Sequence, residues 1–168
     1  DITLETLDEI RMDVREEHTP VYIDVHSLTL GIKEDFTRYH RPLEAWRRWL
    51  FMIHGAQMNE EEARILTSEK LDEPDLAKHT LALNTKVLHI TRGERGCTSF
   101  VDEHKHVQRF DTDGIEVKGA VDPTGCGDVF AGAQLPVMPT ASTAIVAIAT
   151  PLLPEPPPTS PSTTRRLR

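Results

Sequence analysis

The sequence has little cysteine and no surplus of basic residues. Only Cys97 and Cys126 are present, and they stand in unrelated contexts. Two isolated cysteines argue against a disulfide scaffold and favour a protein of the reducing cytosol, so we expect a cytoplasmic location. Acidic residues outnumber basic ones, and the formal net charge of −8 argues against a nucleic-acid partner.

Long apolar runs and internal repeats are also lacking. The apolar run at 144–149 is far too short to cross a bilayer, so we expect no membrane partner. What remains is an ordinary mixture, with 38% apolar and 27% charged residues among 168, and this length allows one domain with a hydrophobic core. The chain begins at Asp1 inside a helical pattern, so we expect residues of a longer protein to precede it.

Strand-like and helix-like patterns alternate over the first 91 residues. Short apolar or β-branched runs predict buried strands at 21–25, 52–58 and 86–91. Amphipathic or capped segments predict helices at 3–17, 41–50, 59–66 and 73–83. We interpret residues 26–42 as a loop, and Trp46 and Trp49 as core residues on one helix face. The alternation predicts an α/β fold with a mainly parallel sheet between helices.

A hairpin and one further strand follow the alternating part. The stretches 97–101 and 105–110 have strand character and are joined by the turn sequence DEHK. His104 and His106 flank Lys105 near this turn without further ligands at metal spacing, so we expect solvated side chains there. Residues 114–119 predict a last short strand.

The stretch VDPTGCGDVFAGA, residues 121–133, places two glycines around a cysteine at the expected start of a helix. If the helix begins near Gly125, the N–H groups of its first turn point outward and carry the positive end of the helix dipole. Glycine lets a ligand approach the backbone, so the pattern predicts an anion site, usually for phosphate. Asp128 is either a base for a hydroxyl that attacks the phosphorus or an ordinary first-turn acid.

Asn59 and Glu62 form a second short motif. Their spacing is that of a capping box at a helix N-terminus. The alternative is that Glu62 lies near a cluster of Mg²⁺ and phosphate and holds the ion through water.

A third motif follows the strand predicted at 86–91. Thr91 ends this strand, and Gly93 and Gly96 follow it. Ligands of open parallel sheets bind at the carboxyl ends of strands, so these residues are candidates for contacts with nucleotide phosphates. A simple glycine turn into the hairpin explains them equally well. Asp122 and Thr124 precede the glycine turn at 125–127, where they bind a cation or brace the loop.

Together these motifs resemble the ribokinase-like (PfkB) carbohydrate kinases, in particular their C-terminal half. The family signature has the form D-T/P-T-G-A-G-D-x-F-x-A/G-G, and DPTGCGDVFAGA follows it closely. The family's Asn-x-x-Glu motif resembles Asn59 to Glu62, and its T-x-G-x-x-G loop resembles Thr91 to Gly96. Cys126 departs from the Ala, Ser or Gly that is usual there. The resemblance implies a partial ribokinase-like three-layer fold.

The resemblance also implies an activity, which is ATP-dependent phosphoryl transfer to a hydroxyl of a sugar or related small alcohol. Asp128 would be the catalytic base, and Glu62 would help to organise Mg²⁺. The anion hole would be formed by the backbone amides of Gly125, Cys126 and Gly127. ATP would be contacted by Asn59, Thr91, Gly93 and Gly96. Asp122 and Thr124 would match a site for a monovalent cation such as K⁺, and the full-length family suggests a homodimer.

The composition changes at Gln134. Residues 134–168 contain no glycine and eight of the twelve prolines, with many threonines and serines. Such a segment cannot bury enough apolar surface to fold alone. We therefore divide the chain into a partial PfkB-type kinase domain at 1–133 and a tail at 134–168 that is either disordered or translated out of frame. The resemblance lacks the family's N-terminal half, so it implies a truncated kinase whose own activity is open.

Two other functions fit parts of the sequence. A truncated kinase would be a noncatalytic nucleotide-binding remnant if it binds ATP without turnover. The sequence GCGDVFAG also satisfies a dinucleotide-binding pattern. That pattern should directly follow a strand and precede an acidic residue by about twenty positions, whereas here Pro123 precedes the turn and the only later acid is Glu155.

Overall fold

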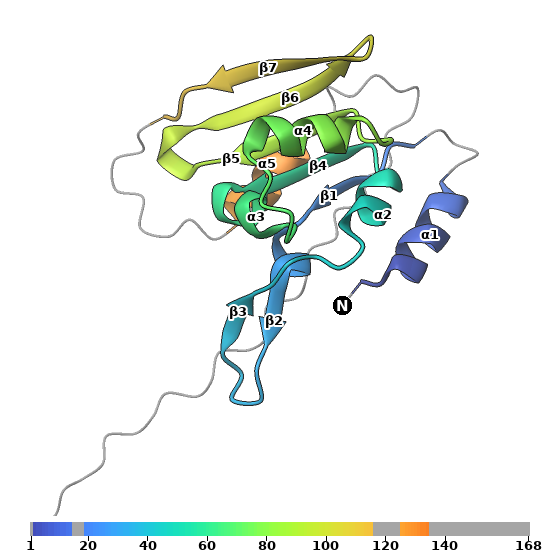
Figure 1. The fold of residues 1–168 in the computed structure, drawn as a ribbon, viewed down its shortest axis with the longest axis vertical. Helices are drawn as coiled ribbons and strands as arrows, with labels where there is room; N and C mark the ends of the chain where they lie inside the picture. The colour runs from blue at the N-terminus through green and yellow to red at the C-terminus, as the bar shows by residue number, and fades with distance from the viewer. Residues whose placement is uncertain (1, 15–18, 116–124, 135–168) are drawn as a thin grey trace, which may run out of the picture.

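The centre of the structure is a five-stranded mixed sheet. The computed structural model describes residues 2–14, 19–115 and 125–134. The strands of the sheet are β1 Tyr22–Asp24, β4 Gly55–Asn59, β5 Val87–Thr91, β6 Cys97–Glu103 and β7 His106–Thr112. They lie in the order β1-β4-β5-β6-β7 (Figure 1). The first three are parallel, and β6 and β7 form an antiparallel hairpin beside β5, which confirms both the predicted parallel strands and the predicted hairpin.

Helices cover both faces of this sheet. Their bounds are α1 Leu4–Asp13, α2 Trp46–Phe51, α3 Glu60–Ile65, α4 Glu73–Leu81 and α5 Cys126–Gln134. Apolar side chains of α1 to α4 share one core with the strands, whereas Ala131 of α5 packs against Tyr22 outside that core. Figure 1 shows α3 and α4 in front of the sheet and α5 behind it. The arrangement has three layers, as the α/β prediction requires.

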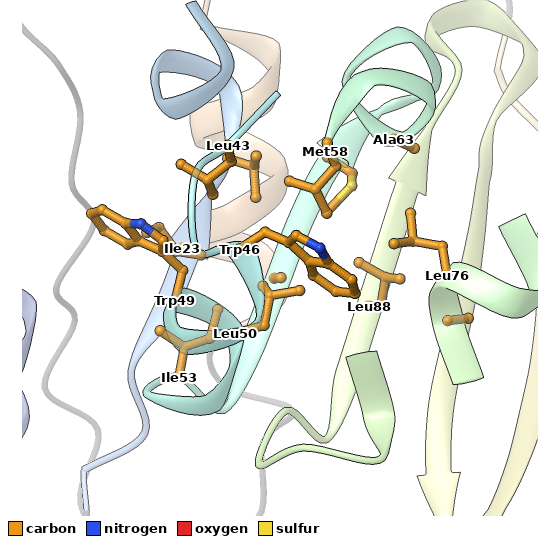
Figure 2. Packing of buried hydrophobic residues seen from close by; sticks show 14 of the residues in the cluster. Ile23, Leu43, Trp46, Trp49, Leu50, Ile53, Met58, Ala63, Leu76 and Leu88 are labelled. Carbon is orange, nitrogen blue, oxygen red and sulfur yellow. The ribbon is translucent and has the colours of Figure 1, made fainter. Parts of the chain in front are cut away.

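The main core lies between the sheet and helices α1 to α4. Side chains alternate along a strand, so Met58 and Leu88 face this core while their neighbours in the strands face α5. Trp46 and Trp49 are 5% and 6% exposed and lie in the same core (Figure 2), which confirms their predicted burial. Burying a large apolar side chain contributes about 1.5–3 kcal/mol, so the two indoles hold the short helix α2 on the sheet.

Helices α1 and α4 begin where a side chain can accept a hydrogen bond from the first turn. The Oγ1 of Thr3 accepts from the N–H of Thr6 at 3.2 Å, and the Oδ1 of Asp72 accepts from the N–H of Asp75 at 2.9 Å. These caps satisfy backbone groups that have no partner within the helix. Helix α1 ends at Asp13, which is earlier than the predicted end at residue 17.

The prediction of a loop at 26–42 is wrong. This segment contains the 3₁₀ helix η1 His26–Thr29 and an antiparallel hairpin of β2 Leu30–Ile32 and β3 Arg38–His40. The connection between the two strands has neither glycine nor proline. Phe36 takes the left-handed conformation with φ +63°, and the Oδ1 of Asp35 accepts from the N–H of Thr37 at 2.9 Å. Asp35 is therefore the one usual turn residue in this connection, and without glycine or proline beside it the signal for a hairpin is weak.

Helix α2 and strand β4 both begin later than predicted. Ala45 has φ +52°, which interrupts the helical conformation, so α2 starts at Trp46 and not at residue 41. Met52 still caps that helix, and β4 consequently starts at Gly55 and not at residue 52.

The end of the chain is described only in part. Gly114 and Ile115 are outside any strand, and residues 116–119 of the predicted last strand lie outside the described residues. So does nearly all of the predicted tail, from residue 135 to 168. None of the helices in the described part of the chain has the length and apolar character that a membrane span requires.

Candidate active site

The first turn of α5 lies at the carboxyl ends of the parallel strands. The side chain of Gln57, in β4, donates a hydrogen bond from Nε2 to the carbonyl oxygen of Gly127 at 2.9 Å. The first bond within the helix runs from the N–H of Val129 to the carbonyl of Gly125 at 3.0 Å. The preceding amides of this turn therefore have no acceptor within the helix. Gly125, Cys126 and Gly127 are exposed, so this turn has the form predicted for an anion site.

Gly125 itself is suited to a close approach by a ligand. Its φ is +83°, a conformation that favours glycine, and a Cβ built there would meet no atom within 4 Å. The space beside it is open. Asp128 is also exposed in this first turn, where a carboxylate complements the helix dipole. The same position also suits a base that acts on a group bound at the amides. Because both interpretations fit, the catalytic role of Asp128 stays a prediction.

Asp24 lies beside the same turn, and it was not identified as a site residue from the sequence. Its Oδ2 accepts a hydrogen bond from Gln57 Nε2 at 2.6 Å, and its Oδ1 accepts from the N–H of His26 at 3.1 Å. Burial raises the pKa of the Asp24 carboxyl above its ordinary value. Asp24 is the last residue of β1 and lies one residue before the end of the strand predicted at 21–25. A carboxylate near the carboxyl end of a parallel strand is the signal that could have identified it.

Glu62 is buried at the start of α3 with both carboxylate oxygens in use. It is 2% exposed. Its N–H donates to Asn59 Oδ1 at 2.9 Å, and its Oε2 accepts from the N–H of Asn59 at 2.7 Å, which confirms the predicted capping box. Its Oε1 lies 2.7 Å from Nδ1 of His26, and this hydrogen bond raises the pKa of His26. The role of Glu62 toward Mg²⁺ stays a prediction.

The loop after β5 forms a glycine turn into the hairpin, which is one of the two interpretations given for its sequence. Thr91 is the strand neighbour of Asn59. The loop continues as the 3₁₀ helix η2 Gly93–Arg95. Gly93 has φ +57°, and a Cβ there would meet no atom within 4 Å. A Cβ at Gly96 would lie only 1.9 Å from the carbonyl oxygen of Thr112, so that glycine is required by backbone packing.

Ion pairs fix this loop to the helices beside it. Arg92 is 14% exposed and donates to Glu73 at 2.5 Å, while Arg95 pairs with Glu60 at 2.5 Å. The loop is thereby held against α3 and α4, with Gly93 on its open side. The space beside Gly93 is open, although its carbonyl accepts from the N–H of Gly96 at 3.0 Å, whereas Arg92 and Arg95 are already paired with acids.

The structure brings most of the predicted site residues to one edge of the sheet. Gln57 donates to both Gly127 of α5 and Asp24. The N–H of His26 donates to the Asp24 carboxylate, and the ring of His26 bonds to Glu62, which links this group to Asn59. Thr91 adjoins Asn59, and the glycines of its loop lie further along. Asp122 and Thr124 lie outside the described residues.

Other features of the described residues lie apart from this edge. A cavity of about 540 Å³ borders the start of α2 and residues 67–69, and none of the predicted site residues lines it. Among the described residues no three His, Cys, Asp or Glu side chains are grouped to hold a metal ion. His104 and His106 are exposed, in agreement with the prediction of a solvated turn.

Comparisons with known proteins agree with this architecture. The family described as pfkB family carbohydrate kinase matches residues 33–137, more than half of the chain. Probable fructokinase-3 of Arabidopsis thaliana is 38% identical over 80 residues, which cover 47% of this chain and 21% of that protein. Putative fructokinase-8 of the same plant is 36% identical over 80 residues, covering 47% of this chain and 35% of the relative.

A solved structure shows the same fold. Ribokinase from Thermotoga maritima superimposes with a TM-score of 0.57 at 24% identity, over 79% of this chain and 38% of that chain. The chain spans about a third or less of the two curated relatives.

Proposed function

Since the chain belongs to the pfkB family of carbohydrate kinases, we propose that it carries the phosphoryl-transfer part of an ATP-dependent phosphotransferase. The acceptor would be a hydroxyl of a sugar or related small alcohol, and the two plant relatives, named as fructokinases, support a sugar. The observation that carries the proposal is the exposed first turn of α5, whose free amides and Asp128 lie together over the ends of β1 and β4.

In the proposed reaction, Asp128 accepts the proton of the attacking hydroxyl. The amides of Gly125, Cys126 and Gly127 donate to the oxygens of the phosphoryl group in transfer, where negative charge is spread in the transition state. Because these donors are backbone groups, Cys126 supplies its amide as well as the alanine of the family signature does. Their fixed orientation in a helix start costs no reorganisation during the reaction.

The nucleotide would lie along the edge formed by β4, β5 and the loop that follows β5. We propose contacts to ATP from Asn59, Thr91, Gly93 and Gly96. The open space at Gly93 and Gly125 supports this placement, because both glycines leave the backbone accessible where a side chain would otherwise stand. The contact from Gly96 would come from its backbone, and its lack of a side chain would also keep the shape of the loop, because a Cβ there would collide with the Thr112 carbonyl.

Glu62 would help to hold Mg²⁺ through water. Each of its oxygens accepts one hydrogen bond from the protein and keeps a lone pair for a further donor. Mg²⁺ is usually bound by one or two carboxylates, waters and substrate phosphates, so a single buried carboxylate fits this mode. When bound, the ion neutralises charge on the phosphates. A monovalent cation such as K⁺ at Asp122 and Thr124 remains part of the proposal.

A noncatalytic nucleotide-binding remnant is the second candidate. The specific observation in its favour is that the chain spans only about a third or less of its curated relatives. Catalysis requires both substrates to be held in position, and a partial site can bind one of them without turnover.

Two measurements on the 168-residue chain separate these functions. Calorimetry measures binding of ATP in the presence of Mg²⁺, and mass spectrometry measures formation of a sugar phosphate from fructose or ribose. Binding with transfer supports the phosphotransferase, and binding without transfer supports the remnant. Absence of ATP binding contradicts both.

A further inference from the structure

Four polar side chains form one row across the sheet on the face that α5 covers. The row runs across four neighbouring strands, β1, β4, β5 and β6. Its members, each opposite the next in the strand register, are Asp24, Gln57, His89 and Ser99. The ring of His89 meets Phe130 of α5 edge-on, with centroids 5.3 Å apart. A sheet face beneath a helix is normally apolar, and buried polar groups are costly unless they are paired.

Gln57 is the member of this row that bonds to α5 directly. It is 2% exposed, and its side-chain amide makes three hydrogen bonds. Nε2 donates to Asp24 Oδ2 at 2.6 Å and to the carbonyl of Gly127 at 2.9 Å, while Oε1 accepts from the hydroxyl of Tyr22 at 3.3 Å. Both donor hydrogens are used, and the acceptors on Asp24 and Gly127 fix which way the amide points.

The bond to Gly127 falls in the turn that would bind phosphate. A Cβ at Gly127 would lie 3.1 Å from Asp24 Oδ2 and 3.4 Å from Gln57 Nε2, so glycine permits this close approach. The other contacts described for α5 are made without hydrogen bonds: Ala131 packs against Tyr22, and Phe130 meets the ring of His89 edge-on. Apolar packing is not directional and an aromatic edge contact is broad in geometry, whereas a hydrogen bond between two fixed atoms sets the rotation and height of one turn more closely.

We propose that Gln57 is a positioning residue, which fixes the first turn of α5 over the ends of β1 and β4 and so places the amides of residues 125–127 and Asp128. The proposal rests on the proposed phosphoryl transfer for its functional meaning. The claim that Gln57 positions α5 can be tested without that function, because the position of α5 is measurable without turnover.

The test compares three variants of the full 168-residue chain. Gln57→Met keeps an unbranched side chain of similar size and removes all three hydrogen bonds. Gln57→Lys keeps donors toward Asp24 and Gly127. Ser99→Ala is the matched control, because it removes the 2.8 Å hydrogen bond to His89 in the same row and leaves the bond to α5 in place.

Amide hydrogen exchange reports the position of α5. We expect the helical N–H groups of Val129, Phe130 and Ala131 to exchange about tenfold faster in Gln57→Met, the size of effect that loss of one buried hydrogen bond produces. The amides of Leu88 and His89 in β5 should change much less. Gln57→Lys and Ser99→Ala should keep the rates in α5 close to those of the unaltered chain.

Equal acceleration in β5 and α5, or no acceleration in α5, would overturn the proposal, because Gln57 would then be only a buried core residue. If Gln57→Met does not fold, Gly127→Ala perturbs the same contact from the helix side and should give the same pattern.

Phosphoryl transfer supplies a second readout. We expect kcat to fall in Gln57→Met with little change in KM for ATP, and to recover in Gln57→Lys. An unchanged kcat in a chain that does transfer phosphate contradicts the positioning. Faster exchange confined to α5, without turnover by the unaltered chain, supports the positioning and counts against the proposed function.

Discussion

Asp128 lies exposed in the first turn of α5, beside backbone amides that have no acceptor within the helix. Replacing it by asparagine removes a proton acceptor and leaves these amides unchanged. We expect Asp128→Asn to lower kcat for sugar phosphorylation by about 10²–10⁴-fold, the usual contribution of a general base, with an almost unchanged dissociation constant for ATP. Steady-state kinetics and calorimetry measure the two effects. A variant that retains more than about a tenth of kcat excludes Asp128 as the base.

Glu62 combines a structural bond pattern with the proposed role toward Mg²⁺. Glutamine at this position can still accept from the N–H of Asn59, so the capping box should survive in Glu62→Gln. The negative charge is lost. We therefore expect the Mg²⁺ midpoint of ATP binding to rise several-fold, while the urea midpoint falls only slightly. Identical Mg²⁺ midpoints in both proteins would leave the cap as the whole role of Glu62.

His89 gives the stability of the fold a dependence on pH. Burial lowers its pKa to about 4, below the ordinary value of about 6.5. The unfolded chain therefore binds a proton in a range where the folded protein does not. The contribution is complete above about pH 6.5 and is lost as the pH falls toward 4, at no more than about 1.4 kcal/mol per pH unit.

Urea unfolding at pH 7 and pH 5 tests this contribution in the unaltered chain and in His89→Gln. Glutamine can keep a hydrogen bond to Ser99 but has no proton to gain. We expect the variant to lose less stability between the two pH values than the unaltered chain does. If both lose the same amount, His89 is not the group that titrates.

At the scale of elements, the loop after β5 offers a matched pair of glycines. Gly96 has φ +91° and ψ −143°, a region almost restricted to glycine, and a Cβ there would collide with the Thr112 carbonyl. Gly93 also has positive φ, but its surroundings are open. We expect Gly96→Ala to destabilise by more than about 2 kcal/mol and Gly93→Ala by about 1 kcal/mol. Equal losses would show that backbone conformation alone decides both, without the contact to β7.

The elements that could be predicted from the sequence are those whose patterns act locally. The strand at 86–91, the capping box at Asn59 and the hairpin after Gly96 each carry their own signal, and all three are found. The β2–β3 hairpin is different, because its turn depends on Phe36 in a left-handed conformation that propensity does not favour.

The residues of the candidate site likewise differ in whether a local sequence pattern marks them. Gly125 to Asp128 form a recognisable motif, and the structure places them as expected at the start of α5. Asp24 and Gln57 have no such motif. A polar residue inside a short strand looks like an interruption of an apolar run, and only the pairing of β1 with β4 brings these two side chains together under α5. Gln57 is 33 residues from Asp24 and 70 residues from Gly127 in the chain, beyond the reach of any local pattern.

At the scale of the whole molecule, the described residues already contain a complete layer structure around β4 and β5, although the chain spans about a third or less of its curated relatives. The sheet ends at β7, whose residues are all exposed, with Val107 and Phe110 among the large apolar side chains at the surface. An edge strand of this kind invites pairing with other chains.

Two C-terminal deletions test how the rest of the chain relates to this layer structure. The composition of residues 135–168 predicts no contribution to a core, so ending the chain after Gln134 should change the free energy of unfolding by no more than about 0.5 kcal/mol. Ending it after Ile115 also removes α5, with its contacts from Ala131 and Phe130 and the hydrogen bond from Gln57. That deletion should cost about 2–4 kcal/mol from lost apolar burial and an unpaired amide. Urea unfolding of both shortened chains beside the whole chain gives the values. A loss of about 2 kcal/mol or more for the chain that ends after Gln134 would mean that residues 135–168 pack onto the domain, and the division of the chain at 133–134 would then be wrong.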